Sequence, residues 1–193
     1  ERALAAGTTT DKIFDMLEKN KEHFHVPMVF MTYINVIFVY GIEKFAKRTK
    51  EIGMAGVIVP DMPFEEKEEL DQIFRRYELD VISLIAPTSR ERIKAIAAEA
   101  QGFIYCVSSL GVTGVRDNIS QGVAEMVREV KKVKDIPCAV GFGISTPEQA
   151  ENMAAVSDGV IVGSAIVRIV GEYGRECVEK VGEYVRSMKE ALG

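Results

Sequence analysis

Short apolar runs alternate with amphipathic segments along most of this chain. The apolar runs lack the in–out alternation of a half-exposed strand, so they predict short β-strands that are buried on both faces. Six such strands are expected, at Pro27–Thr32, Gly56–Val59, Val81–Ala86, Phe103–Val107, Ile136–Gly141 and Gly159–Val162. The segments with helical spacing are Ile13–Asn20, Glu43–Ile52, Glu65–Tyr77, Arg90–Ala100, Ser120–Val133 and Arg175–Leu192.

Strands that alternate with helices in this way pair in parallel and form an α/β fold. The repeat length fits either a (β/α)8 TIM barrel or a doubly wound sheet. No G-x-G-x-x-G pattern with a downstream acid follows the strand at Gly56–Val59, which argues against a dinucleotide site. The residues at the ends of the last two strands favour the barrel.

Two glycine turns connect the last two expected strands to the segments that follow them. Gly143 comes after one strand, and Gly163 with Ser164 comes after the other, roughly 20 residues later. Free backbone N–H groups at two neighbouring helix N-termini favour a phosphate group. In TIM barrels this phosphate site commonly lies after strands seven and eight, so we expect these to be the last two strands of a barrel.

The first of these two helices has clear start signals. Ser145 with Glu148 fits a capping box, and Thr146 before Pro147 fits an N-cap followed by proline in the first helical position. Both patterns predict that a helix begins directly after the turn at Gly143.

The chain has 193 residues, whereas a complete barrel typically has about 250. Residues Glu1–Gly7 resemble the last turn of a helix that ends at a glycine, with no strand before it. We therefore expect one incomplete TIM-barrel domain over residues 1–193, with about six βα units and with the first quarter missing. Its open edges, Pro27–Thr32 and Gly159–Val162, are expected to pair with other strands or to promote association.

Composition and charge exclude several other classes of protein. Apolar residues make up 47% and charged residues 27%, which is ordinary for a globular protein, and the net charge is −5. Without a basic cluster, neither nucleic acid nor a membrane surface is an expected partner. No signal peptide is recognisable, and Cys106 and Cys138 fall inside apolar strands. These features predict a cytoplasmic protein with reduced core cysteines.

The residues at the carboxyl ends of the strands decide the chemistry of a barrel. No lysine and no His or Glu cluster stands there, which disfavours a Schiff-base aldolase and a metal site. Asp61 could orient a substrate or a loop, or could cap a helix. Tyr33 and Tyr105 could line a pocket or belong to the core. The loop with Thr113 and Gly114 could close over a ligand or be a passive connection.

Taken in order, five motifs resemble the α-subunit family of tryptophan synthase over essentially the whole chain. They are Met31–Asn35, Val59–Pro63, Tyr105–Ser108 followed by Gly111–Gly114, Gly141–Ser145 and Val162–Val167. The resemblance implies a (β/α)8 barrel that cleaves indole-3-glycerol phosphate to indole and glyceraldehyde 3-phosphate. It also implies an α2β2 assembly with a β subunit that carries pyridoxal phosphate, and no cofactor in this chain.

The resemblance also assigns roles to individual residues. It implies a phosphate cradle at Gly114, Gly143, Gly163 and Ser164. It implies pocket lining by Tyr33, Tyr105, Thr113 and Phe142, and apolar walls from Met31, Pro60 and Leu84. It implies a lid from Ser108 to about Ile119, and loop or partner contacts at Asn35, Asp61 and Pro63.

The two catalytic carboxylates of the family would both precede Glu1, so no catalytic residue is expected in this chain. We therefore expect the chain by itself to be inactive. Two alternatives remain open, another phosphate-binding TIM-barrel enzyme and a non-catalytic module that binds phosphate or activates a partner.

Overall fold

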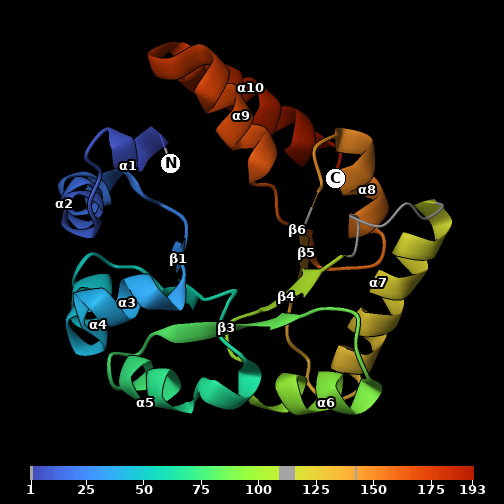
Figure 1. Cartoon of the computed structure of the whole chain (residues 1–193). Helices are drawn as coiled ribbons and strands as arrows, with labels where there is room; N and C mark the ends of the chain where they lie inside the picture. Colours follow the sequence, from blue (N-terminus) through green and yellow to red (C-terminus); the bar gives the residue numbers. More distant parts are fainter. Residues whose placement is uncertain (1, 109–115, 142) are drawn as a thin grey trace. The chain divides into compact units, whose positions relative to one another are not determined.

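The computed structural model describes residues 2–108, 116–141 and 143–193 (Figure 1). It divides into two compact units, Glu1–Ile82 and Ser83–Gly193, called unit 1 and unit 2 below. The single domain expected over residues 1–193 stays a prediction.

The described strands form one parallel sheet in which every strand is bonded to the next one along the chain. They are β1 (Val29–Met31), β2 (Gly56–Ile58), β3 (Asp80–Ile85), β4 (Ile104–Val107), β5 (Cys138–Gly141) and β6 (Gly159–Val160). A doubly wound sheet reverses its strand order at one point, and this sheet does not. Of the two architectures expected from the sequence, the topology is therefore that of a barrel.

Unit 1 is built around an aromatic core. Its helices are α1 (Arg2–Ala5), α2 (Thr10–Asn20), η1 (Lys21–His23), α3 (Ile34–Tyr40), α4 (Ile42–Glu51), η2 (Phe64–Glu66) and α5 (Glu68–Arg76). Phe14, Phe45 and Phe74 are almost fully buried. The Phe45 ring contacts the rings of Phe14 and Phe74, and both Phe14 and Phe45 contact the rings of Phe30 and Tyr40. Edge-to-face aromatic pairs of this kind add specificity to the burial of apolar area.

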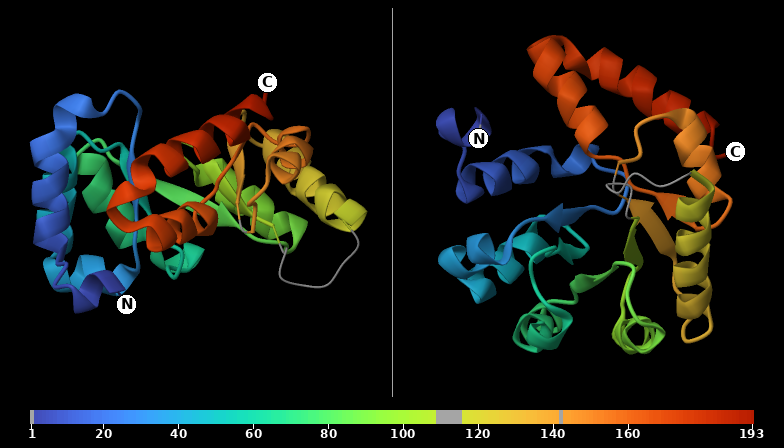
Figure 2. Two further views of the ribbon diagram at one scale, coloured as in Figure 1. Left: turned by 90° about the horizontal axis from the view of Figure 1, so that it is seen from above. Right: turned by 45° about the vertical axis from the view of Figure 1, so that its right-hand side comes forward.

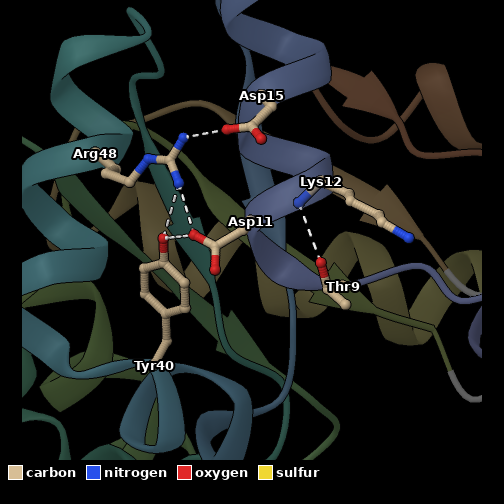
Figure 3. A network of polar contacts seen from close by, with 6 residues as sticks. All are labelled: Thr9, Asp11, Lys12, Asp15, Tyr40 and Arg48. Carbon is tan, nitrogen blue, oxygen red and sulfur yellow. Dashed lines mark hydrogen bonds and ion pairs between the residues drawn. The ribbon is translucent and has the colours of Figure 1, made fainter.

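A polar network fixes α2 against α3 and α4 beside this core (Figure 3). Arg48 donates to Asp11 at 2.8 Å and to Asp15 at 2.7 Å, and the Tyr40 hydroxyl also donates to Asp11. The bond from Tyr40 and the nearby cations lower the pKa of Asp11, and the bond to Asp15 raises the pKa of Arg48. The guanidinium also lies over the Phe14 ring, so the network and the core hold the same helices together.

Unit 2 places its helices around the strands from β4 to β6. They are α6 (Arg90–Glu99), α7 (Arg116–Lys131), α8 (Pro147–Ala154), α9 (Ser164–Tyr173), η3 (Gly174–Glu176) and α10 (Cys177–Glu190). Gly174 has a positive φ of 55° where α9 ends. The chain turns back there, so α9 and α10 lie side by side (Figure 2).

Apart from shifts of one to three residues at helix ends, such as α5 beginning at Glu68 and not at Glu65, the structure differs from the predicted helices in three places. Helix α3 was not predicted, because Ile34–Tyr40 is apolar apart from Asn35 and so shows no amphipathic helical period. Helix α7 begins at Arg116, not at Ser120, so the last residues assigned to the lid, up to Ile119, are helical. The capping box at α8 consists of Thr146 and Gln149, so the predicted Ser145–Glu148 box was wrong.

Candidate phosphate and pocket site

The turn residues after β5 and β6 lie at the same end of the sheet. In the parallel ladder Val140 is paired with Val160, and Gly143 and Gly163 each follow three residues later. Gly143 has a φ of 86°, a conformation that favours glycine, and both glycines are exposed. The ladder therefore brings together two of the turns that were predicted to hold phosphate.

The two helix N-termini at these turns are not equivalent. At α8 the Thr146 side chain accepts from Gln149 N–H at 3.2 Å, and the Gln149 side chain accepts from Ser145 N–H at 2.8 Å. Gly163, the N-cap residue of α9, has no side chain and makes no such bond. The first N–H groups of α9 are thus available to an anion, together with the positive end of the helix dipole.

Ser108 links the end of β4 to the end of β5. Both its backbone N–H and its hydroxyl donate to the Gly141 carbonyl, at 3.1 Å and 3.0 Å, and its side chain is fully buried. The sequence pointed to Ser108 as the last residue of one family motif and as the start of the proposed lid. Its contact with Gly141 joins residues far apart in sequence, and no sequence signal announces it.

The predicted pocket-lining residues Leu84 and Tyr105 lie in one row across the sheet. Leu84 is paired with Tyr105, and Tyr105 is paired with Ala139. The Tyr105 ring reaches over Gly141, where any Cβ would overlap with its hydroxyl and ring carbons. Tyr105 is 8% exposed, and this burial raises the pKa of its hydroxyl. The Tyr105 hydroxyl therefore stays protonated and uncharged at physiological pH, and it can line a pocket or form a hydrogen bond.

In unit 1, Asp61 is bonded to the start of α3. Its Oδ1 accepts from the backbone N–H of Ile34 at 3.0 Å, where the N-cap residue Tyr33 provides no side-chain bond. Asp61 thus caps α3, whose bonded residue lies 27 positions earlier in the sequence, and not the helix that follows Asp61. The residues near Ile34 or Asp61 in sequence that are exposed include Met31, Tyr33, Asn35, Pro60 and Pro63.

Several predicted site residues lie outside the described part of the chain. They are Thr113, Gly114 and Phe142, together with most of the proposed lid. Their roles, and the pocket role of Tyr33, stay predictions.

The described residues offer no other obvious chemistry. No group of three or more His, Cys, Asp or Glu side chains that could hold a metal ion occurs among them. None of the described helices is long and apolar enough to cross a membrane. Cys106 and Cys138 are fully buried free thiols, as predicted. The hydrogen bond between them, together with burial, raises the pKa of Cys106, so this thiol stays protonated.

Comparison with known proteins agrees with these observations. The family model of the tryptophan synthase alpha chain matches residues 1–193. The chain belongs to this family. The alpha chain of Lacticaseibacillus casei is 43% identical over 191 residues, which cover 99% of this chain and 72% of that relative. The alpha chain of Caldanaerobacter subterraneus is 44% identical over 194 residues, with 100% and 74% covered.

Solved structures confirm the expected fold. Tryptophan synthase subunit alpha from Campylobacter jejuni superposes with a TM-score of 0.88 and 35% identity, over 95% of this chain and 73% of that one. The alpha chain from Legionella pneumophila gives a TM-score of 0.86 at 32% identity. The six parallel strands with flanking helices are thus an incomplete (β/α)8 barrel, and the family places the chain among the enzymes of tryptophan biosynthesis.

Proposed function

We propose that this chain is the substrate-holding part of a tryptophan synthase α subunit and binds indole-3-glycerol phosphate. The observation that carries the proposal is the open N-terminus of α9, which lies level with Gly143 at the ends of neighbouring strands. The first N–H groups of α9, from Ser164 onward, and the turn at Gly143 would donate to the phosphate oxygens. Gly114 would complete the cradle.

The rest of the substrate would lie along the strand ends of unit 2. Leu84 and Tyr105 share one row of the sheet and form a largely apolar wall suited to an indole ring. Thr113 and Phe142 are proposed to add to this lining. Ser108 would support the wall from behind, because its bonds to the Gly141 carbonyl fix the strand end that carries Gly143.

The proposed reaction is retro-aldol cleavage to indole and glyceraldehyde 3-phosphate, a carbon–carbon lyase step that needs an acid–base pair. Asp61 at the end of β2 is already bonded to Ile34 N–H and is not assigned to this role. The two family carboxylates would stand ahead of Glu1. We therefore propose that the 193-residue polypeptide binds substrate without turning it over.

The proposed partner is a tryptophan synthase β subunit in an α2β2 assembly. Pyridoxal phosphate would belong to that subunit, and this chain would need no cofactor of its own. Asn35, Asp61 and Pro63 are exposed in unit 1, which supports their predicted role in loop bracing or partner contact.

Calorimetric titration with glycerol phosphate tests the phosphate site. In Ser164→Asp the new carboxylate suits a helix N-terminus but repels the ligand, so the Kd should rise by about tenfold or more. Thr146→Asp is the matched control, because it adds the same charge at the self-capped α8 and should change Kd by about threefold at most. Equal effects of the two variants, or no binding by the unaltered chain, would refute this site.

Indole formation tests the proposed division of roles. The 193-residue chain should release no indole from indole-3-glycerol phosphate, with or without a β subunit. The same chain preceded by the family segment that carries the two carboxylates should release it. Turnover at a normal rate by the 193-residue chain would contradict the proposal, and binding without turnover by the extended protein would favour a non-catalytic module.

A further inference from the structure

The two glycine turns of the candidate phosphate site carry no positively charged side chain of their own. Neither Gly143–Glu148 nor Gly163–Val167 contains a lysine or an arginine, and Glu148 places a negative charge in the first turn of α8. Backbone N–H groups and helix dipoles supply only partial positive charges, whereas a phosphate monoester carries close to two negative charges at neutral pH. A full positive charge near these turns would therefore strengthen the site.

Arg168 is the first cation that follows the second turn along α9, and it lies on the same side of the helix as Ser164. The two residues are four positions apart, so their side chains are neighbours on the helix surface. Helical side chains also tilt toward the N-terminus, which brings the Arg168 guanidinium within reach of the first turn, about 6 Å away along the axis. Ser164 and Arg168 are both exposed, as an approaching ligand requires.

A contact with α10 relates Arg168 to the other turn as well. The Tyr184 hydroxyl donates to the Ser145 carbonyl at 3.0 Å, and Ser145 lies two residues beyond Gly143. Burial raises the pKa of the Tyr184 hydroxyl, and the positive charge of Arg168 opposes this rise, so the guanidinium lies close to Tyr184. Arg168 is thus near both of the turns whose N–H groups are proposed to hold the phosphate.

The Arg168 guanidinium is also available to a ligand. It forms no hydrogen bond or ion pair with the residues that the structure describes, although Glu172 lies four positions further along α9. The first turn of α9 contains no acidic residue that could compete with an anion. Arg48 in unit 1 differs in this respect, because Asp11 and Asp15 already hold its guanidinium.

We propose that Arg168 is a specificity-determining residue of the phosphate site. Its guanidinium donates to the phosphate oxygens beside the first N–H groups of α9, and its full charge makes the site prefer a doubly charged phosphate monoester over a singly charged ester. The planar guanidinium suits this task, because it can donate two parallel hydrogen bonds to one phosphate group. This inference rests on the proposed phosphate site and adds to it a side chain and a preference for ligand charge.

Calorimetric titration of the 193-residue chain with two ligands tests the role of Arg168. Glycerol phosphate and glycerol sulfate are compared at pH 8, where the first carries two negative charges and the second carries one. In Arg168→Gln the Kd for glycerol phosphate should rise by about tenfold and that for glycerol sulfate by only about threefold, because the Coulomb energy scales with the ligand charge. Arg168→Lys keeps the charge, so both Kd values should stay within about threefold of the unaltered chain.

Arg175→Gln is the matched control. Arg175 is exposed in η3, beyond the other end of α9, so the substitution removes the same charge far from Ser164. Screening by salt should keep the change in either Kd below about twofold.

The possible failures can be told apart. An unchanged Kd in Arg168→Gln, with Ser164→Asp still weakening binding, would exclude Arg168 from the site and leave the site itself standing. Equal losses for the two ligands, or the same losses in Arg168→Lys, would show that the substitution disturbs α9 and that the charge has no role. Absence of binding by the unaltered chain would refute the phosphate site, and the role of Arg168 with it.

Discussion

Gly141 shows how a single residue can shape the candidate pocket. No side chain fits there, because a Cβ would overlap with the Tyr105 hydroxyl and ring. Gly141→Ala should therefore displace Tyr105 and lower the free energy of unfolding by about 1–3 kcal/mol, as overpacking of a core does. Gly159→Ala is the control, because a Cβ there meets nothing within 4 Å. Urea denaturation measures both variants, and equal stabilities would contradict the assigned clash.

Asp158 is a second residue whose substitution should change stability measurably. It lies where β5 and β6 begin, at the end of the strands away from the glycine turns. Its carboxylate accepts from Cys138 N–H at 2.8 Å and from Lys131 at 3.0 Å, and these two bonds lower the pKa of Asp158. A carboxyl whose folded pKa lies below its unfolded value stabilises the fold above the unfolded pKa, near 3.8. That stabilisation is lost as the pH falls through the folded pKa.

Asp158→Asn should consequently lower stability by only about 1 kcal/mol at pH 7, because the side chain is partly exposed and screened. The difference from the unaltered protein should shrink as the pH falls through the folded pKa of Asp158, which lies below 3.8. Asp135→Asn is the comparison, since that carboxylate is fully exposed and pairs with Lys131 at 3.5 Å. Denaturation curves from about pH 2 to 7 give the result, and a loss that stays the same over this range would disprove the role of the charge.

At the scale of elements, α3 depends on a cap from outside its own sequence. Asp61 supplies the bond to Ile34 N–H that the N-cap residue Tyr33 does not. Asp61→Ala should lower stability by about 1 kcal/mol and speed amide exchange in α3, whereas Asp61→Asn keeps an acceptor and should behave almost as the unaltered chain. If both variants exchange alike, the cap contributes nothing.

The sequence predicted those elements whose signals are local. The six strands, most helices and the helix start at Thr146–Pro147 follow from apolar runs, periodicity and capping residues. Helix α3 could not be predicted, because apolar residues lie on most of its surface and give no amphipathic pattern. Its capping residue, Asp61, also lies 27 residues away in sequence. The Ser108–Gly141 bonds and the contact of Tyr105 with Gly141 are likewise products of strand register.

The sequence correctly predicted that a helix begins after each glycine turn. It did not predict that the two helix N-termini differ in their capping. Both Gly143 and Gly163 precede a helix, and sequence alone treats the two as equal donors. The structure shows that the Thr146–Gln149 capping box satisfies α8 from within, so α9 is left as the open N-terminus. Which side chain turns back to its own helix depends on rotamers and local packing, beyond what a residue pattern specifies.

At the scale of the whole molecule, β3 belongs to both units. Asp80–Ile82 is paired with β2 in unit 1, and Ser83–Ile85 is paired with β4 in unit 2. Because one strand is shared, unfolding of either unit removes hydrogen-bonding partners from the other. We therefore predict that the chain unfolds as one cooperative domain, in agreement with the single domain expected from the sequence.

Two equal substitutions test this cooperativity. Val57 in β2 and Val140 in β5 are both fully buried, one in each unit. Each change to alanine should cost about 2 kcal/mol through lost burial and a small cavity. If the domain is single, both variants shift the same urea transition, and circular dichroism and tyrosine fluorescence follow one curve. If Val57→Ala moves only part of the transition and Val140→Ala the other part, the two units fold separately and the single-domain prediction is wrong.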